Sequence, residues 1–183
     1  MSEPRARRHD PERRDRIVEA CLDVLAEVGV AGTSHRRVAA AADVPLGSMT
    51  YHFTGMSELL HEAFDRLART VSARFDEQLA AAGDQDSARK ALVAFIDHDI
   101  LSDPRELVLS HELYTLAARA PAYRDITHAW MAASRRSLRR HFDPLTARLL
   151  DALVEGLSIH RALDLEAPTP GATDEAIRRM LRA

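Results

Sequence analysis

The chain has 183 residues, of which 46% are hydrophobic but only 5% aromatic, and this composition suits a core built mostly from Ala, Leu and Val. Its formal net charge of -3 excludes a polycation that coats nucleic acid, so any nucleic-acid binding must come from a local patch. The single cysteine excludes an intramolecular disulfide, and no apolar run reaches the roughly 18 residues of a membrane span. We therefore expect a soluble, cytoplasmic protein.

Arginine is concentrated near the N-terminus, where six arginines fall within twelve residues. They are Arg5, Arg7, Arg8, Arg13, Arg14 and Arg16. Such a cluster can form a basic arm that lies along or in the minor groove of DNA. The alternative is a solvated tail, because runs of charge are often simply hydrated.

The cysteine falls on the apolar stripe of a predicted first helix. Cys21 follows Ile17 by four residues and precedes Val24 and Val28 at helical spacing. We expect it to be buried rather than a redox sensor, because reactive cysteines are partly exposed beside cations.

A short helix is predicted from about residue 34 to residue 41. Thr33 and Ser34 both suit its N-cap, because a hydroxyl there accepts a hydrogen bond from an unpaired backbone N–H, and the following stretch is rich in alanine. Pro45 disfavours the α conformation in the residue before it but suits the first turn of a new helix. A second short helix is therefore expected from Pro45 to about residue 51.

These two helices share an apolar seam and leave one side polar. The seam would consist of Val38, Ala42, Val44, Met49 and Phe53. The other side of the second helix carries residues that suit a DNA groove, because hydroxyl and imidazole groups reach phosphate oxygens and an apolar side chain can meet a thymine methyl. The residues on this side are Leu46, Gly47, Ser48, Thr50, Tyr51 and His52.

Flanking residues extend this pattern in both directions. In chain order they read Arg16-Ile17-Val18-Glu19-Ala20, Leu25-Ala26-Glu27-Val28-Gly29, Thr33, Val38-Ala39, Ala42, Val44, Gly47, Tyr51-His52-Phe53 and Leu59-Leu60. This order and spacing, over about 45 residues, resembles the DNA-binding domain of the TetR family of bacterial transcriptional regulators. The resemblance implies an all-α fold, with a three-helix helix-turn-helix DNA-binding domain at residues 1–55 and a helical ligand-binding and dimerisation domain at residues 56–183.

The candidate DNA contacts fall into two groups. We assign base-edge contacts to Leu46, Ser48 and Thr50, while Gly47 would let the backbone approach the DNA closely. We assign phosphate contacts to Thr33, Arg36, Arg37, Tyr51 and His52.

Three positions depart from the family pattern. Asp43 stands where the turn usually has glycine, so the turn requires a left-handed conformation that aspartate tolerates. Thr50 replaces the first of two adjacent aromatic residues, so the preferred DNA site should differ from that of relatives. Met56 replaces a lysine that commonly contacts the DNA backbone, although the helix N-terminus there still offers its dipole and free N–H groups.

The rest of the chain predicts further helices. Apolar residues from Leu60 to Leu79 recur at three and four residues and indicate one long amphipathic helix. Prolines and glycines separate the helices that follow. The expected ranges are 57–82, 87–101, 104–119, 121–142, 144–165 and 174–181.

A homodimer is expected, because the second half carries more apolar surface than one thin domain can cover. In the family, the last two long helices pack against those of a second copy in a four-helix bundle, and here they would be roughly 122–142 and 144–164. Gly156 would allow close approach of the neighbour. A dimer also presents two reading helices to consecutive major grooves, which predicts a palindromic double-stranded DNA operator.

The resemblance also implies a small-molecule effector, held among the long helices of the second domain. Asp99 and Glu112 lie at helical spacing from apolar neighbours, and aromatic residues such as Phe95, Tyr114 and Trp130 fall nearby. Such a set would favour a lipophilic cation. The alternative is that these carboxylates are paired internally with Arg119 or Arg124, because a buried carboxylate without a partner is costly.

Metal sensing and catalysis have weaker support. Asp97-His98-Asp99 and His111-Glu112 come nearest to a metal site, but no paired His or Cys spacing of the structural-zinc kind is present. The segment from Gly156 to His160 faintly resembles a nucleophile motif, yet it lacks the second glycine and falls within a helix pattern. We expect no enzyme activity, no catalytic or metal-binding residues and no cofactor.

The sequence therefore predicts a ligand-responsive DNA-binding regulator. Repression, rather than activation, follows from the family resemblance alone, as does release by a small effector through the 57–82 helix. One alternative is a regulator of the same fold that responds to a metal ion or a protein partner. A more distant alternative is a helical interaction module that does not bind DNA.

Overall fold

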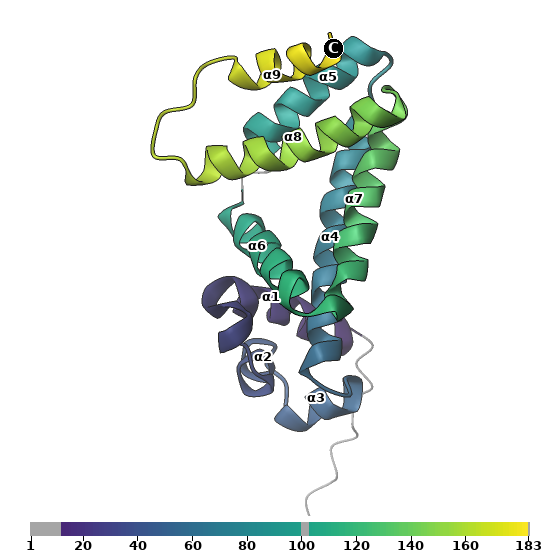
Figure 1. Cartoon of the computed structure of the whole chain (residues 1–183). Coiled ribbons are helices and arrows are strands. Elements are labelled where there is room, and N and C mark those ends of the chain that lie inside the picture. The colour runs from purple at the N-terminus through teal and green to yellow at the C-terminus, as the bar shows by residue number, and fades with distance from the viewer. Residues whose placement is uncertain (1–11, 100–102, 183) are drawn as a thin grey trace, which may run out of the picture. The chain divides into compact units, whose positions relative to one another are not determined.

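The computed structural model describes residues 12–99 and 103–182, and all regular structure within these ranges is helical (Figure 1). This confirms the predicted all-α class. The chain divides into two compact units, residues 1–63 and 64–183. None of the helices in the described ranges combines the length and the apolar character needed to cross a membrane.

The first unit contains the helix-turn-helix. Its helices are α1 (Arg13–Gly32), α2 (His35–Ala41), α3 (Leu46–His52) and the start of α4 (Met56–Ala80). Helix α1 is interrupted at Gly29, whose φ of 68° lies in the left-handed region that favours glycine. Cys21 is fully buried on α1, as predicted, and burial raises the pKa of its thiol to about 12. Its thiol is therefore unreactive near neutral pH.

The α2–α3 turn has the geometry that the sequence requires. Ser34 caps α2, because its hydroxyl oxygen accepts a hydrogen bond from the backbone N–H of Arg37 at 3.4 Å. Asp43 adopts a φ of 51°, so aspartate occupies the left-handed position predicted for it. Val38, Met49 and Phe53 are buried between the helices, which fixes how α3 is presented.

Arg14 connects α1 to α3 and to the first turns of α4. Its guanidinium lies 4.8 Å from the centroid of the Phe53 ring and forms ion pairs with Glu58 and Glu62. Arg14 belongs to the cluster predicted to form a basic arm, but its contacts lie inside the first unit. Arg5, Arg7 and Arg8 lie outside the described residues.

The second unit consists of the remaining helices. They are the rest of α4, α5 (Gln85–Ala94), the π-helix η1 (Phe95–Asp99), α6 (Pro104–Arg119), the 3-10 helix η2 (Pro121–Tyr123), α7 (Arg124–Leu138), α8 (Pro144–Leu163) and α9 (Ala172–Leu181). Asp103 and Asp143 cap α6 and α8, each with a proline in the first turn, and Asp84 forms a capping box with Ser87 at the start of α5.

Two helices of this unit differ from the prediction. Of the helix predicted at 87–101, residues 100 and 101 lie outside the described ranges. The described part becomes α5 followed by η1, in which hydrogen bonds link residues five apart instead of four. The helix predicted at 121–142 opens with the 3-10 turn η2 and ends at Leu138. Both differences are changes of helix geometry within one apolar pattern, and spacing alone does not distinguish such variants.

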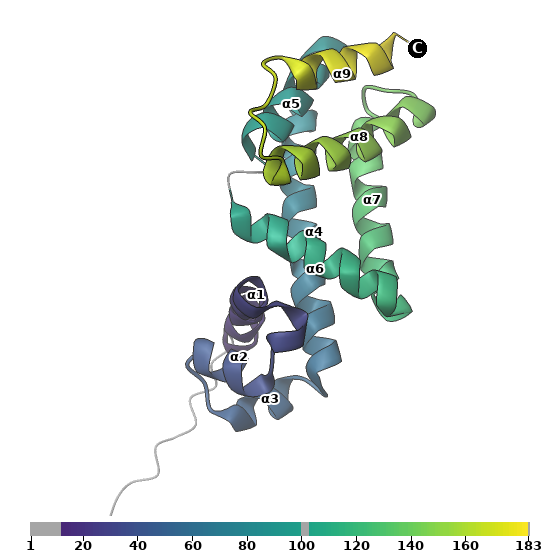
Figure 2. The same cartoon turned by 60° about the vertical axis from the view of Figure 1, so that its left-hand side comes forward.

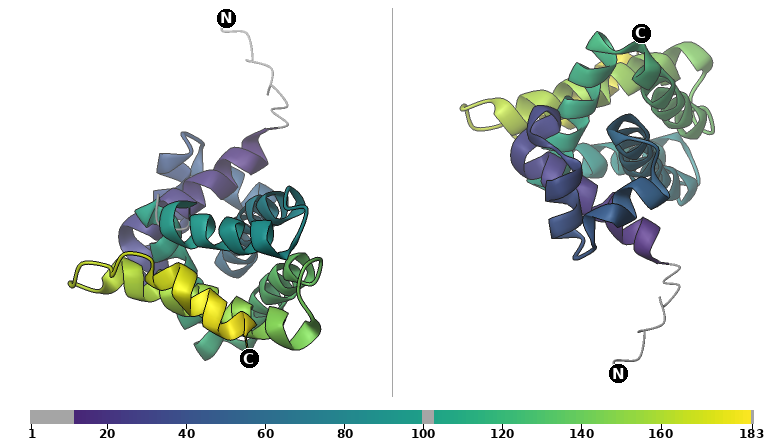
Figure 3. Two further views of the ribbon diagram at one scale, coloured as in Figure 1. Left: turned by 90° about the horizontal axis from the view of Figure 1, so that it is seen from above. Right: turned by 90° about the horizontal axis from the view of Figure 1, so that it is seen from below.

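Ion pairs connect neighbouring helices of the second unit. Helix α9 lies against α8 and α5 (Figures 2 and 3), where Arg89 of α5 pairs with Asp174 of α9. Arg74 of α4 donates two hydrogen bonds to the carboxylate of Glu106 on α6, at 2.6 and 2.9 Å. These paired charges link helices that are far apart in the sequence.

The left-handed residue in the α2–α3 turn can be tested by substitution. Asp43→Val should lower the free energy of unfolding by about 1–2 kcal/mol, because a β-branched residue is strained at positive φ. Asp43→Gly should be neutral to within about 1 kcal/mol, because easier left-handed geometry is offset by greater freedom in the unfolded chain. Urea denaturation followed by circular dichroism measures both. Equal stability of the two variants would contradict the strain argument.

Candidate DNA-reading surface and ligand cavity

The predicted DNA-reading side of α3 is exposed. Tyr51 is 82% exposed and Leu46 is 51% exposed, and both are unusually exposed for large apolar or aromatic side chains. Gly47 and Thr50 are also exposed, and a Cβ atom added at Gly47 would meet no other atom within 4 Å. The tip of α3 therefore offers an open surface to a groove.

Two candidate residues of α3 lie at the border of this surface. Ser48 and His52 are half-buried. The His52 ring packs edge-on against the Tyr51 ring, with centroids 4.9 Å apart. Partial burial and the nearby charges of Arg13 and Arg14 lower the pKa of His52, so the neutral imidazole is favoured at neutral pH. His52 can thus offer one hydrogen-bond donor without adding a positive charge.

The candidates outside α3 partly serve the fold. The Thr33 hydroxyl donates a hydrogen bond to the carbonyl of Gly29 at 2.7 Å. Arg37 donates from its guanidinium to the carbonyl of Gly32 at 3.0 Å, while Arg36 is exposed on α2. Arg37 is also exposed, so its remaining donors face solvent.

Glu58 stabilises the start of α4, a role that the sequence analysis missed. Its carboxylate accepts hydrogen bonds from the backbone N–H and the hydroxyl of Thr54, both at 2.7 Å. These bonds lower the pKa of Glu58 and keep it ionised. The end of α4 at which relatives carry lysine therefore has Met56 and a carboxylate, which makes it a weaker anchor for phosphate than the sequence suggested. The Thr54–Glu58 spacing was the available signal.

A cavity of about 50 Å³ lies in the second unit. It is lined by Val71, Ser72, Phe75, Phe95, Tyr114, Trp130, Met131, Ser134, Asp151, Val154 and Glu155, from α4, η1, α6, α7 and α8. The Phe75 and Phe95 rings lie 4.8 Å apart, and the Tyr114 and Trp130 rings are stacked at 6.1 Å with an interplanar angle of 22°. The cavity walls are thus mainly aromatic.

Two carboxylates from consecutive turns of α8 reach this cavity. Asp151 is neutralised by Arg135 of α7, with 3.1 Å between Nη1 and Oδ2. Glu155 accepts a hydrogen bond from the Tyr114 hydroxyl at 3.0 Å, and no described arginine or lysine forms an ion pair with it. Burial raises the pKa of Glu155 and the Asp151 charge adds to this, while the Tyr114 hydrogen bond and the His111 charge act in the opposite direction. Glu155 therefore has no arginine or lysine partner among the described side chains, and His111 is the basic group whose charge acts on it.

The structure brings three of the five predicted ligand residues together. Phe95, Tyr114 and Trp130 line the cavity, whereas Asp99 and Glu112 do not. Asp99 instead receives a hydrogen bond from Gln78 and lies 3.9 Å from Arg74. Gln78 and Arg74, both on α4, thus hold the Asp99 carboxylate outside the cavity. Glu112 lies two residues before Tyr114 on α6, which places it on nearly the opposite side of that helix.

Glu155 and Asp151 were missed from the sequence. The available signal was a pair of acids four residues apart in the otherwise apolar turns of α8. For Asp99 the internal partner differs from the predicted Arg119 or Arg124, because Arg74 takes that role. Arg124 also donates to the carbonyl of Ala117. In residues 12–99 and 103–182, no group of three or more His, Cys, Asp or Glu side chains is placed to bind a metal ion.

Comparisons with known proteins match both units. Residues 17–63 match the family model for bacterial regulatory proteins of the tetR family, and residues 83–183 match the model for the tetracyclin repressor-like C-terminal domain. The HTH-type transcriptional regulator PksA of Bacillus subtilis (strain 168) is 27% identical over 168 residues, which cover 84% of this chain and 80% of PksA.

Solved structures give the same result. The candidate transcriptional regulator SCO7518 from Streptomyces coelicolor A3(2) is 55% identical, with a TM-score of 0.89 over 94% of this chain and 100% of that chain. The multidrug binding protein EbrR, complexed with ethidium, is 33% identical, with a TM-score of 0.78 over 92% of this chain and 98% of that chain. The chain belongs to the TetR family of bacterial transcriptional regulators.

Proposed function

We propose that this DNA-binding regulator represses transcription as a homodimer on a palindromic operator and that a lipophilic organic cation releases it. The observation that carries the effector class is Glu155, a carboxylate with a raised pKa that lies among aromatic rings and has no arginine or lysine partner among the described side chains. An organic cation would supply the missing charge and stack on the rings.

The related protein EbrR supports this effector class. Its solved structures include complexes with ethidium, proflavin and malachite green, all of which are aromatic organic cations. In the present chain, the stacked rings of Tyr114 and Trp130 and the carboxylate of Glu155 line one cavity, which is the combination that such ligands require.

The dimer surface that we propose lies on α8. Its inner side is buried at Ala147, Leu150 and Val154, whereas its outer side exposes Leu145 and Leu149. The outer side continues in helical spacing through Ala152, Gly156 and Leu163, and a Cβ atom added at Gly156 would meet nothing within 4 Å. A second copy of α8 would cover these apolar residues.

Helix α7 contributes less to this surface than the sequence suggested. Ile126 and Leu138, on its predicted apolar side, are 2% and 0% exposed within one protomer. Met131 is its exposed apolar residue, at 41%. We therefore centre the proposed dimer contact on α8.

Release of DNA would follow if the cation binds one arrangement of the helices more tightly than the arrangement that binds DNA. Helix α4 is continuous from Met56 in the first unit to Ala80 in the second, and it contributes Val71, Ser72 and Phe75 to the cavity. A cation that binds one arrangement of these helices better than the other shifts the population toward it, and reciprocally DNA weakens cation binding.

DNA contacts by α3 and α2 can be separated by their salt dependence. Genomic fragments selected by the purified protein would supply the operator. Tyr51→Phe should weaken binding to every selected sequence by about tenfold or less without changing the salt slope, because an uncharged phosphate contact is lost. Arg36→Ala should weaken binding and reduce the salt slope by about one, because one fewer counterion is released. Fluorescence anisotropy measures both. Weaker binding by Tyr51→Phe at only some base sequences would instead indicate a base contact.

The proposed cation site predicts a pH-dependent affinity. Because the pKa of Glu155 is raised above its ordinary 4.5, protonation begins at a higher pH than for an exposed glutamate, and the protonated acid does not attract a cation. Ethidium affinity should therefore fall as the pH is lowered toward the ordinary value of 4.5, and the fall should begin at a higher pH than an exposed glutamate would give. Glu155→Gln should lose about 10- to 100-fold in affinity and most of this pH dependence.

Glu112→Gln is the matched control for that experiment. It makes the same chemical change at an acid that does not line the cavity. Isothermal titration of ethidium into each variant gives the affinities, and loss of DNA release by ethidium in Glu155→Gln would connect the site to regulation. Equal affinities of wild type and Glu155→Gln would exclude Glu155 as the charge partner.

A substitution on the exposed side of α8 tests the proposed dimer. Leu149 is 45% exposed in the protomer, so Leu149→Glu should leave helicity unchanged but convert the dimer to monomer and abolish operator binding. Leu165→Glu is the control, because it places the same charge at a fully exposed leucine after α8. Sedimentation velocity gives the mass of each variant. A Leu149→Glu variant that stays dimeric would contradict a dimer through this stripe.

A further inference from the structure

Trp130 lies at the meeting point of three cavities in the second unit. One is the 50 Å³ cavity described above, and a second inner cavity of about 40 Å³ lies beside Glu106 and Ser110. The third is an open groove of about 630 Å³ between α4 and α7. Trp130 lines all three, whereas Ser72 lines only the groove and the first inner cavity.

The inner cavities are too small for the effector class proposed above. Sites for drug-sized molecules usually measure about 300–1,000 Å³. Neither inner cavity approaches that range, but the groove does. A cation that reaches Glu155 must therefore enlarge the inner space, and the groove is the nearest large volume that shares a wall with it.

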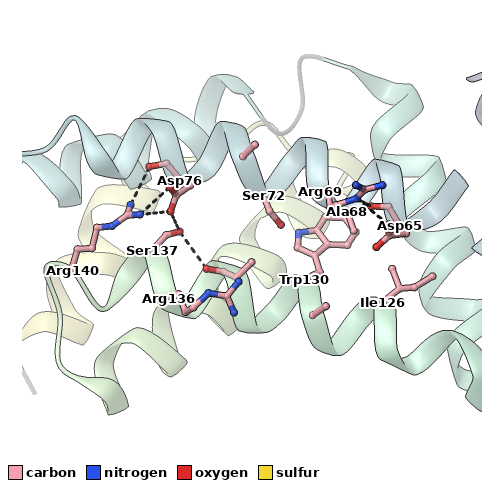
Figure 4. A pocket seen from close by; sticks show the side chains of 13 residues that line it. Asp65, Ala68, Arg69, Ser72, Asp76, Ile126, Trp130, Arg136, Ser137 and Arg140 are labelled. Carbon is pink, nitrogen blue, oxygen red and sulfur yellow. Dashed lines mark hydrogen bonds and ion pairs between the residues drawn. The ribbon is translucent and has the colours of Figure 1, made fainter. Parts of the chain in front are cut away.

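That shared wall is a side chain with room to move. Figure 4 shows the Trp130 indole between α4 and α7, with Ser72 on the facing helix. The groove also has larger and charged lining residues, but five of its residues are small, namely Ala68, Ser72, Ala73, Ala129 and Ala133. Trp130 is half-buried, and rotation of its indole toward the groove would meet small side chains instead of a packed core.

The polar groups at the groove are consistent with rotation of the Trp130 indole toward it. The Ser72 hydroxyl oxygen is buried and has no hydrogen-bond partner among the described residues, which is an unfavourable state for a polar atom. Farther along the groove, Asp76 of α4 accepts hydrogen bonds from Arg140 at 2.9 Å and from Ser137 of α7 (Figure 4). The two helices are thus linked by hydrogen bonds at the Asp76 end. Around Trp130 the groove has alanines and the unpaired Ser72 hydroxyl, and at its other end Ile126 and the Arg69–Asp65 ion pair (Figure 4).

We infer that the groove between α4 and α7 is the entry route for the effector and that Trp130 is its gate. When the indole lies against Tyr114, it separates the groove from the inner cavities. When it rotates outward, the three volumes join into one chamber that extends from solvent to Glu155, and an aromatic cation can take the place beside Tyr114. This inference rests on the proposed cation site and adds its access route.

Tryptophan fluorescence can test the gate directly, because Trp130 is the single tryptophan of the chain. Tetraphenylphosphonium is a lipophilic cation that does not absorb the indole emission. Its binding to the full chain should shift the Trp130 emission to longer wavelength and increase quenching by acrylamide, because the indole has moved toward solvent. An emission spectrum and quenching that stay unchanged while the cation binds would overturn the gate.

Ala133→Phe provides an independent kinetic test. Ala133 lines the groove but neither inner cavity, so the added ring would narrow the route without altering the cation site. Stopped-flow measurements with ethidium should show association and dissociation both slowed by at least about fivefold, with Kd unchanged within about twofold. Ala129→Phe, at a second groove alanine, should act alike if Ala133→Phe fails to fold. Ala118→Phe, on an exposed position of α6 outside these cavities, should leave both rates unchanged.

These outcomes separate the gate from the proposed function. If the wild-type protein binds neither ethidium nor tetraphenylphosphonium, the proposed cation site fails and the gate fails with it. If it binds both, but the two groove variants show unchanged rates, the cation site stands and the gate is excluded.

Discussion

The organisation of the second unit depends on α8, which must satisfy two different surroundings at once. Its inner side packs Ala147, Leu150 and Val154 into the core, while its outer side leaves Leu145 and Leu149 exposed. Apolar residues on the outer side of a helix gain stability when a second surface covers them. The inner side also carries Asp151 and Glu155 to the cavity, so the same helix presents the proposed dimer surface and the proposed charge of the ligand site.

The carboxylates of the second unit differ in whether an arginine lies close enough to compensate their charge. Arg74 pairs with Glu106 and lies near Asp99, and Arg135 pairs with Asp151, so these acids are compensated within the fold. Glu155 has the Tyr114 hydroxyl instead, and burial raises its pKa. Because a partly buried carboxylate is costly without a cation, this arrangement distinguishes a site that can accept a charged ligand from a network that only stabilises the fold.

The helix-turn-helix depends on local geometry more than on charge. A left-handed Asp43, the Ser34 cap and the buried Val38, Met49 and Phe53 fix α3 so that Leu46 and Tyr51 face outward. Arg14 is held against Phe53, Glu58 and Glu62, so part of the arginine-rich N-terminus serves the domain itself. Arg14 therefore contributes to the fold, so a count of the N-terminal arginines overstates the positive charge that can contact DNA.

The sequence by itself determined the all-α class, most helix boundaries, the helix-turn-helix and its exposed residues, because these follow from caps, prolines and apolar spacing that act over a few residues. It also indicated the aromatic members of the cavity. Only the tertiary structure decided which acid accompanies them, because Gln78 and Arg74 of α4 engage Asp99 and the packing of α8 brings Glu155 in. Contacts between helices far apart in the chain depend on packing and helix geometry, and neither is encoded in the spacing of a single segment.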